Sequence, residues 1–321
     1  MVQNEIIKII EKSESIALFS HTRPDADTIG AALALCYVLK RKGKKTQIFC
    51  DTQLEPRLSF LKGNDEIEKE FYGKYDAHIA LDCGDAYRLG LLMDSFFKGN
   101  ITVNIDHHNL TNDKYAQINW VDTRASSSEM VYELIEMMNV DIDVDIAQAV
   151  MSGIITDTNS FSNTNTDEKV LATAGKLIKY VNINALNFTL RRNTSYGRMR
   201  LMGQAMSRAR NYFDGKVILM YVLNQDLIDN NVTLSATEGF VEQALNVDSA
   251  KAAVCICQAS ESGYKVSMRG KDGTDVCAVC QSFGGGGHKV AAGCNVNGFF
   301  EDVVDKILKA FADELNYERI Y

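Results

Sequence analysis

Short apolar runs alternate with helix-length segments through the first half of this chain, and this alternation is the strongest constraint on its fold. The strand candidates lie at 16–20, 46–50, 77–81 and 101–105, and the helix candidates at 28–40, 126–138, 146–155 and 166–180. Strands that alternate with helices imply right-handed crossovers and a parallel sheet. We therefore predict an α/β domain whose ligand crevice lies outside the carboxyl ends of the strands.

The second half has a different pattern. Strand candidates lie at 216–223, 252–258 and 264–269, and helix candidates at 275–283 and 300–315. Longer strands with fewer crossovers predict a smaller α+β domain. A chain of 321 residues also exceeds what one hydrophobic core usually serves. We expect a catalytic domain over 1–185, a helical linker over 186–209 and a C-terminal nucleotide-binding domain over 210–321.

The connecting stretch, 184–210, has helix composition and is rich in arginine. Its arginines are Arg191, Arg192, Arg198, Arg200, Arg208 and Arg210. We interpret them as the charged face of a solvated connector. The alternative is that one or two of them face the ligand crevice.

Bulk composition limits the classes of partner. The net charge of −8 and the pI near 5.3 argue against broad coating of nucleic-acid backbone, but allow a short nucleotide held by a few local arginines. The sequence shows neither a secretory signal nor a bilayer-length apolar run. We therefore expect no membrane association, a cytoplasmic location and reduced cysteines. Cys277 and Cys280 have the spacing of half a zinc site but lack a second pair, so buried thiols are favoured.

Carboxylates and imidazoles gather at four segment ends. They follow the first, third and fourth strands and close the helix at 146–155; the residues are His21, Asp25, Asp27, Asp82, Asp106, His107, His108 and Asp157. Oxygen and imidazole ligands without thiolate suit hard divalent ions such as Mn²⁺, with Mg²⁺ as a second choice. The carboxylates suffice for two ions.

Each cluster also has an ordinary structural interpretation. The loop after the first strand could be a solvated turn capped by Asp27 or Thr28, and Asp82 could cap a helix. Asp106-His107-His108 is more specific, because adjacent side chains diverge. We expect His107 to ligate metal, His108 to meet substrate and Asp106 to orient a ligating imidazole. The remaining His78 lies in an apolar run and is expected in the core.

A glycine run in the second half is the candidate substrate-holding element. It comprises Gly284, Gly285, Gly286 and Gly287 and is followed by His288. Four glycines let backbone N–H groups approach a ligand closely, and Arg269 and His288 could bind a terminal phosphate. The alternative is a flexible turn.

The ordered series His-x-x-x-Asp-x-Asp, Asp, Asp-His-His, Asp resembles the DHH phosphoesterase superfamily. The glycine run, Ala291-Ala292-Gly293 and Ser267-x-Arg269 resemble the C-terminal domain associated with it. The resemblance implies one ion on His21, Asp25 and Asp82. It implies a second ion on Asp27, Asp82, His107 and Asp157, with Asp82 bridging. Ala26, Ala31 and Asn159 depart from the usual pattern, which leaves the ligands intact but bears on substrate preference.

Trp120-Val121-Asp122, Ala125-Ser126-Ser127 and Glu129 are similar to the branch of the family that degrades very short oligonucleotides. The resemblance implies hydrolysis of short RNA or DNA to 5′-mononucleotides, activity on pAp, and a second domain that holds the far nucleotide. The alternatives are a phosphodiesterase for cyclic or linear dinucleotides, a pyrophosphatase and a non-catalytic nucleotide sensor. The oligomeric state is left open, with a homodimer as one alternative.

Overall fold

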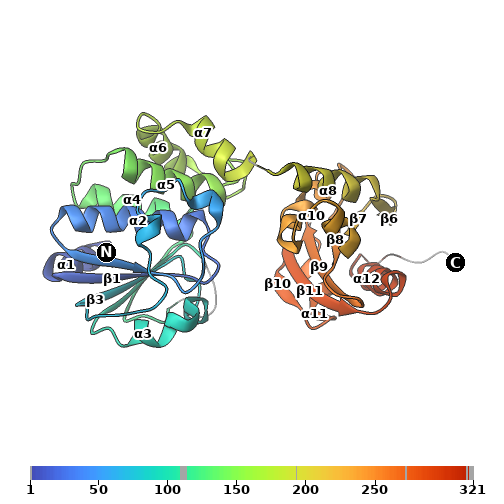
Figure 1. The fold of residues 1–321 in the computed structure, drawn as a ribbon, viewed down its shortest axis with the longest axis horizontal. Helices are drawn as coiled ribbons and strands as arrows, with labels where there is room; N and C mark the ends of the chain where they lie inside the picture. The colour runs from blue at the N-terminus through green and yellow to red at the C-terminus, as the bar shows by residue number, and fades with distance from the viewer. Residues whose placement is uncertain (1, 109–113, 193, 272, 316, 318–321) are drawn as a thin grey trace. The chain divides into compact units, whose positions relative to one another are not determined.

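The computed structural model describes residues 2–108, 114–192, 194–271, 273–315 and 317 (Figure 1). The chain forms two compact units, Met1–Asn193 and Thr194–Tyr321, and their boundary falls inside the stretch expected as a connector. The first unit has a parallel sheet and the second a mixed sheet, so the predicted fold class is confirmed. In the described parts of the chain, no helix has the length and apolar character needed to cross a membrane.

The sheet of the first unit has five parallel strands in the order β2-β1-β3-β4-β5. The strands are β1 (Ser15–Ser20), β2 (Lys45–Phe49), β3 (Ala77–Leu81), β4 (Thr102–Asp106) and β5 (Ile118–Val121). The first four were predicted. β5 was missed because it has only four residues and three of them are partly exposed, so it lacks a continuous apolar run.

Helices cover both faces of this sheet. The α-helices and 3₁₀ segments of the unit are α1 (Val2–Lys12), α2 (Ala26–Arg41), η1 (Pro56–Leu58), η2 (Asn64–Glu66), η3 (Ala86–Leu92), α3 (Met93–Phe97), α4 (Ser127–Met137), α5 (Val144–Asp157), α6 (Glu168–Leu177) and α7 (Ile183–Asn187). In Figure 1, α2, α4 and α5 lie on one side of the sheet and α3 on the other. Ile16 and Leu18 of β1 belong to the core formed with α2, α4 and α5, whereas Ala17 and Phe19 belong to the core beside α3. Burial on both faces explains why these strands were recognisable as apolar runs.

His78 of β3 is a core residue, as expected. Only 3% of it is exposed, its Nδ1 lies 2.9 Å from the carbonyl oxygen of Phe96, and its ring contacts those of Phe19 and Phe71. Burial lowers its pKa, so the ring is held neutral. It takes no part in the cluster described below.

The arginine-rich connector is broken rather than continuous. α7 ends at Asn187, a π-helical turn spans Phe188–Arg192, and α8 (Tyr196–Ser207) begins after the Ser195 cap; Asn193 lies outside the described residues. Three of the arginines have partners within the second unit. Arg198 donates to the carbonyls of Ala236 and Glu238, Arg208 pairs with Asp226, and Arg210 pairs with Glu301.

The second unit is built on a six-stranded sheet in the order β10-β11-β9-β8-β7-β6. Its strands are β6 (Arg210–Tyr212), β7 (Val217–Val222), β8 (Ala252–Gln258), β9 (Gly263–Gly270), β10 (Gly286–His288) and β11 (Ala291–Asn297). Its helices are α8, α9 (Asn224–Asp229), η5 (Leu234–Thr237), α10 (Phe240–Leu245), α11 (Val276–Gln281) and α12 (Phe300–Glu314). α11 and α12 pack on one face; α8 and α10 pack on the other.

Candidate metal centre

The predicted ligands converge at the carboxyl end of the parallel sheet. His21 follows β1, Asp82 follows β3 and His107 follows β4, and these three strands are adjacent. Donor atoms of the whole set form three overlapping groups, each within 4.8 Å: His21, Asp25 and Asp82; Asp27, His107 and Asp157; and Asp82, His107 and His108. The structure therefore brings together all eight residues named from the sequence, with Asp106 behind His108.

The first group lies on the loop between β1 and α2. His21 Nε2 is 3.4 Å from Asp82 Oδ2 and 3.8 Å from Asp25 Oδ2. The other oxygen of Asp25 accepts the backbone N–H groups of Asp27 and Thr28, so Asp25 is the helix cap. The alternative interpretation, a loop capped by Asp27 or Thr28, does not hold, because the cap is Asp25. One carboxylate both caps α2 and faces His21.

The second group lies between β4 and the end of α5. His107 Nε2 is 3.1 Å from Asp157 Oδ2, 3.4 Å from Asp82 Oδ1 and 3.9 Å from Asp27 Oδ2. The two oxygens of Asp82 therefore face different histidines, Oδ2 towards His21 and Oδ1 towards His107. Such a carboxylate is placed to be shared by both groups.

Asp106 contacts a different imidazole from the one expected. Its Oδ1 accepts a hydrogen bond from Nδ1 of His108 at 2.8 Å, whereas Nδ1 of His107 faces the carbonyl oxygen of Arg124 at 3.3 Å. Adjacent side chains at the end of a strand point in opposite directions, so only one of them can reach the Asp106 carboxylate. Asp106 therefore orients His108, which we expect to meet substrate.

The start of α4 forms the floor of the cluster. The backbone N–H groups of Ser127 and Ser128 donate to the two oxygens of Asp27 at 2.7 and 2.9 Å, and the Ser127 hydroxyl donates to Asp82 Oδ1 at 3.0 Å. Gly153 of α5 makes this approach feasible, because a Cβ there would lie 2.3 Å from Asp27 Oδ1. The serines stand in the motif noted above, but nothing in the sequence indicated which side chains they would hold.

Electrostatics in the cluster are unfavourable without a cation. Burial, and then the carboxylates of Asp157 and Asp82, raise the pKa of Asp27 well above its ordinary value. Burial also raises the pKa of Asp157, to about 6. Burial lowers the pKa of His107, but Asp157 and Asp82 outweigh it and raise this pKa to about 12. The cluster alone thus retains protons that isolated groups would release at neutral pH.

The donor set fits divalent cations. Nε2 of His21 and Nε2 of His107 are buried and make no hydrogen bond among the described residues, although both point at carboxylates. Buried polar nitrogens without a partner are costly, and a bound cation would satisfy them. Carboxylate and imidazole ligands suit hard or borderline divalent ions.

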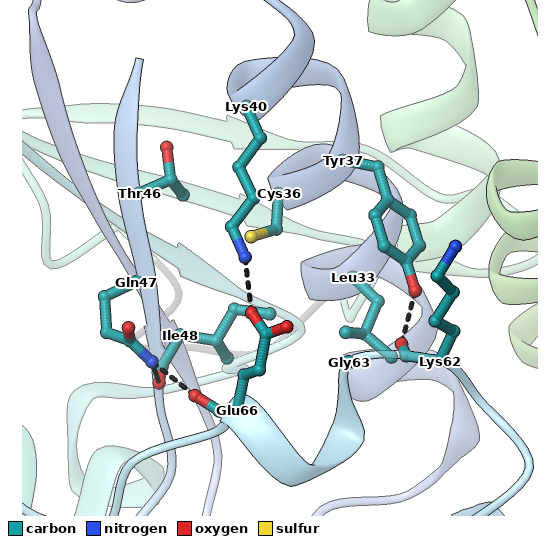
Figure 2. A pocket seen from close by; sticks show the side chains of 10 residues that line it. All are labelled: Leu33, Cys36, Tyr37, Lys40, Thr46, Gln47, Ile48, Lys62, Gly63 and Glu66. Atoms are coloured by element: carbon teal, nitrogen blue, oxygen red, sulfur yellow. Dashed lines mark hydrogen bonds and ion pairs between the residues drawn. The ribbon is translucent and has the colours of Figure 1, made fainter. Parts of the chain in front are cut away.

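The first unit also contains a separate small cavity, which is a weaker candidate for a ligand site. It lies between the second half of α2, β2 and η2, and its polar side chains already bind one another (Figure 2). Lys40 pairs with Glu66 at 2.6 Å, the Tyr37 hydroxyl donates to the carbonyl of Lys62, and Gln47 donates to the carbonyl of Glu66. Few groups remain there to bind a ligand.

The glycine run of the second unit is part of an edge strand. Gly284 and Gly285 use their N–H groups in the turn after α11, donating to the carbonyls of Gln281 and Cys280, while Gly286 and Gly287 lie in β10. Gly287 has a φ of 146°, and a Cβ there would lie 2.5 Å from the carbonyl oxygen of Ala291. β10 and β11 were missed because glycine and alanine lack strand character.

The predicted phosphate-binding side chains lie in one row of this sheet. Arg269 of β9 is in register with Ala291 of β11, which is in register with His288 of β10. Residues directly opposite one another share a face, and a span of two strands is about 10 Å. Arg269 pairs with Glu242 of α10 at 2.9 Å, and His288 is exposed.

Comparison with known proteins agrees with this architecture. Residues 15–154 match the DHH family N-terminal domain, and residues 214–316 match the DHHA1 domain. The chain belongs to the DHH family. It is 32% identical, over 97% of its length and 93% of the relative's, to a protein of Thermus thermophilus named bifunctional oligoribonuclease and PAP phosphatase NrnA.

Solved structures share the fold. An exopolyphosphatase-related protein from Bacteroides fragilis superimposes with a TM-score of 0.90 at 22% identity, over 97% of this chain and 96% of that one. A structure of RecJ from Thermus thermophilus in complex with Mn²⁺ has a TM-score of 0.52 at 14% identity, over 99% of this chain and 54% of that one. At these identities the likeness concerns the fold.

Mn²⁺ should stabilise metal-free protein at pH 7, because it replaces repulsion among buried carboxylates with attraction. At 100 times its dissociation constant, we expect the melting temperature of the first unit to rise by roughly 5–10 °C. Differential scanning calorimetry after chelation and dialysis measures this. Asp82→Asn should lose the gain, and Asp76→Asn, at the other end of β3, should keep it. Full retention of the gain in Asp82→Asn would contradict the shared-carboxylate arrangement.

Proposed function

We propose that this chain is a divalent-metal-dependent phosphoesterase that hydrolyses RNAs of a few nucleotides to 5′-mononucleotides and also dephosphorylates pAp. The observation that carries the proposal is the pair of ligand groups that share Asp82. Its substrate class is supported by the Thermus relative, which is named an oligoribonuclease and PAP phosphatase and whose match extends over both domains.

Two ions are proposed, with Mn²⁺ preferred over Mg²⁺. His21, Asp25 and Asp82 would hold one ion, and Asp27, Asp82, His107 and Asp157 the other. When bound, such a pair lowers the pKa of water and offsets charge on the phosphoryl oxygens. This chemistry requires no nucleophile from the protein.

His108 is the proposed phosphate-contacting residue. Its side chain is 29% exposed, and its Nδ1–H is engaged by the fully buried Asp106 carboxylate. This contact fixes the plane of the ring and leaves Nε2 available to the substrate. We propose that His108 stabilises the phosphate as a donor rather than acting as a base.

The second unit offers an open sheet face for the rest of the substrate. On this face of β9 and β11, alternate residues are exposed or half-buried: Lys265, Ser267, Arg269, Ala291, Gly293 and Asn295. Small residues at Ala291 and Gly293 leave room for a flat nucleobase, and Arg269 and His288 border the same row. To bind a phosphate, Arg269 would give up its partly exposed ion pair with Glu242. Such a pair contributes little free energy in water.

A substrate panel tests the function. Purified protein should be incubated with labelled RNAs of two to five nucleotides, a long RNA, pAp, linear and cyclic dinucleotides, and pyrophosphate, under Mn²⁺ and under Mg²⁺. We expect mononucleotides from the shortest RNAs, phosphate release from pAp and faster turnover with Mn²⁺. Preference for a cyclic dinucleotide or for pyrophosphate would replace the proposal, and absence of turnover on every substrate would favour a nucleotide sensor.

The adjacent histidines should separate metal binding from catalysis. His107→Ala should lose Mn²⁺ binding and hydrolysis together, because its Nε2 faces three carboxylates. His108→Ala should bind Mn²⁺ nearly as wild type while kcat falls by roughly 10²–10³-fold, the usual cost of one electrostatic donor. Isothermal titration and steady-state kinetics on a two-nucleotide RNA measure the two effects. Equal loss of Mn²⁺ affinity in both variants would remove the assigned division.

Arg269 should contribute to substrate binding rather than to the chemical step. Arg269→Ala should raise KM for short RNAs about tenfold with kcat nearly unchanged, since a charge-assisted hydrogen bond is worth roughly 1.5–3 kcal/mol. Glu242→Gln is the matched control, because it removes the ion-pair partner and leaves the guanidinium; its KM should not rise. An unchanged KM in Arg269→Ala would exclude the role.

A further inference from the structure

One short segment contacts three of the six proposed metal ligands without being a ligand itself. It runs from the end of β5 into the first turn of α4, over residues 122–128. Through Ser127 and Ser128 it binds Asp27 and Asp82, and through the carbonyl of Arg124 it faces Nδ1 of His107. The segment thus reaches three of the four proposed ligands of the second ion.

The segment is itself firmly held. The Arg124 guanidinium donates to Asp122 at 2.9 Å and to Glu133 at 2.5 Å, and the carboxylate of Glu129 accepts the N–H of Ala125 at 3.0 Å. Asn165 donates to the carbonyls of Ala125 and of Asp157, at 2.9 and 3.2 Å, and so ties the segment to the end of α5. Its groups therefore present fixed donors and acceptors to the cluster.

Asp82 is the ligand whose orientation matters most. It has a φ of 60°, in the left-handed region that few non-glycine residues adopt, and only 1% of it is exposed. Its N–H donates to the carbonyl of Ile105, so its backbone is fixed, but its carboxylate could still rotate. The hydroxyl of Ser127 donates a hydrogen bond to Oδ1 of this carboxylate, at 3.0 Å.

The Ser127 hydroxyl holds one of the two oxygens of the Asp82 carboxylate. With Oδ1 held by Ser127, Oδ1 faces His107 at 3.4 Å and Oδ2 faces His21 at 3.4 Å. A rotation of the carboxylate about its terminal bond would break this hydrogen bond and turn both oxygens away from the two histidines. Ser127 is fully buried, so bulk water does not reach its hydroxyl.

We propose that Ser127 is a positioning residue of the metal centre: its hydroxyl holds the Asp82 carboxylate with one oxygen directed at His107 and the other at His21. The inference rests on the proposed two-ion function. It assigns Ser127 no contact with substrate or with metal. Outer partners of this kind commonly change metal affinity by 10–100-fold when removed.

Metal titration of the full-length protein tests the inference. Mn²⁺ binding should be measured by isothermal titration for wild type, Ser127→Ala and Ser152→Ala. Ser152 is the matched control, because it is also a fully buried serine and its hydroxyl donates to the carbonyl of Gln148 within α5. We expect Ser127→Ala to bind Mn²⁺ at least about tenfold more weakly, and Ser152→Ala to remain within twofold of wild type.

Two further measurements distinguish a misfolded variant and a failure of the proposed function from a failure of the inference about Ser127. Thermal unfolding of each variant shows whether it is folded, and a crystal of wild-type protein soaked in Mn²⁺ shows whether Ser127 Oγ stays within hydrogen-bond distance of Asp82 when ions are bound. A folded Ser127→Ala with wild-type Mn²⁺ affinity, or an Asp82 carboxylate turned away from Ser127 in the soaked crystal, overturns the inference. Wild-type protein that binds no Mn²⁺ and cleaves no short RNA overturns the proposed function instead.

Discussion

The concentration of buried negative charge at the carboxyl end of the parallel sheet is the constraint on which the rest of this structure depends. Asp27 and Asp82 are almost completely buried within one cluster, and Asp157 joins them from the end of α5. Buried carboxylates persist only where something offsets their charge. Here backbone N–H groups, a hydroxyl and two imidazoles offset part of the negative charge. The pKa of Asp27 is nevertheless raised, so the offset is incomplete.

The fold of the first unit could be predicted because burial on both faces makes parallel strands readable. β1 to β3 carry apolar residues on both faces, whereas β4 carries Val103 and Ile105 on one face and buried polar residues on the other; each of the four was located within one or two residues. The elements that were missed lack this signal. β10 consists of Gly286, Gly287 and His288, and its strand conformation comes from pairing with β11 rather than from intrinsic preference.

In the candidate site, the sequence likewise predicted which residues would gather but not their individual contacts. Position in the chain indicated which side chains would gather, because the ends of adjacent parallel strands meet at one edge. It did not indicate which atoms would pair. Tertiary packing determines three such contacts. Asp25 caps α2 with one oxygen, Asp106 binds His108 rather than His107, and α4 begins against Asp27. Asn159, at a position where glycine was expected, has a φ of 49°, which asparagine tolerates better than most residues.

The acidity of the cluster also bears on how an acidic protein could bind an anionic substrate. Asp25, Asp27, Asp82 and Asp157 carry four negative charges when ionised, and two divalent cations carry four positive charges. A phosphate approaching the bare carboxylates would be repelled, whereas the loaded centre would present exposed positive charge next to His108. Under the proposed two-ion function, substrate affinity in the first unit would depend on metal occupancy. Selectivity against other anions would then have to come from groups outside the ion pair, and Arg269 is the candidate proposed for this role.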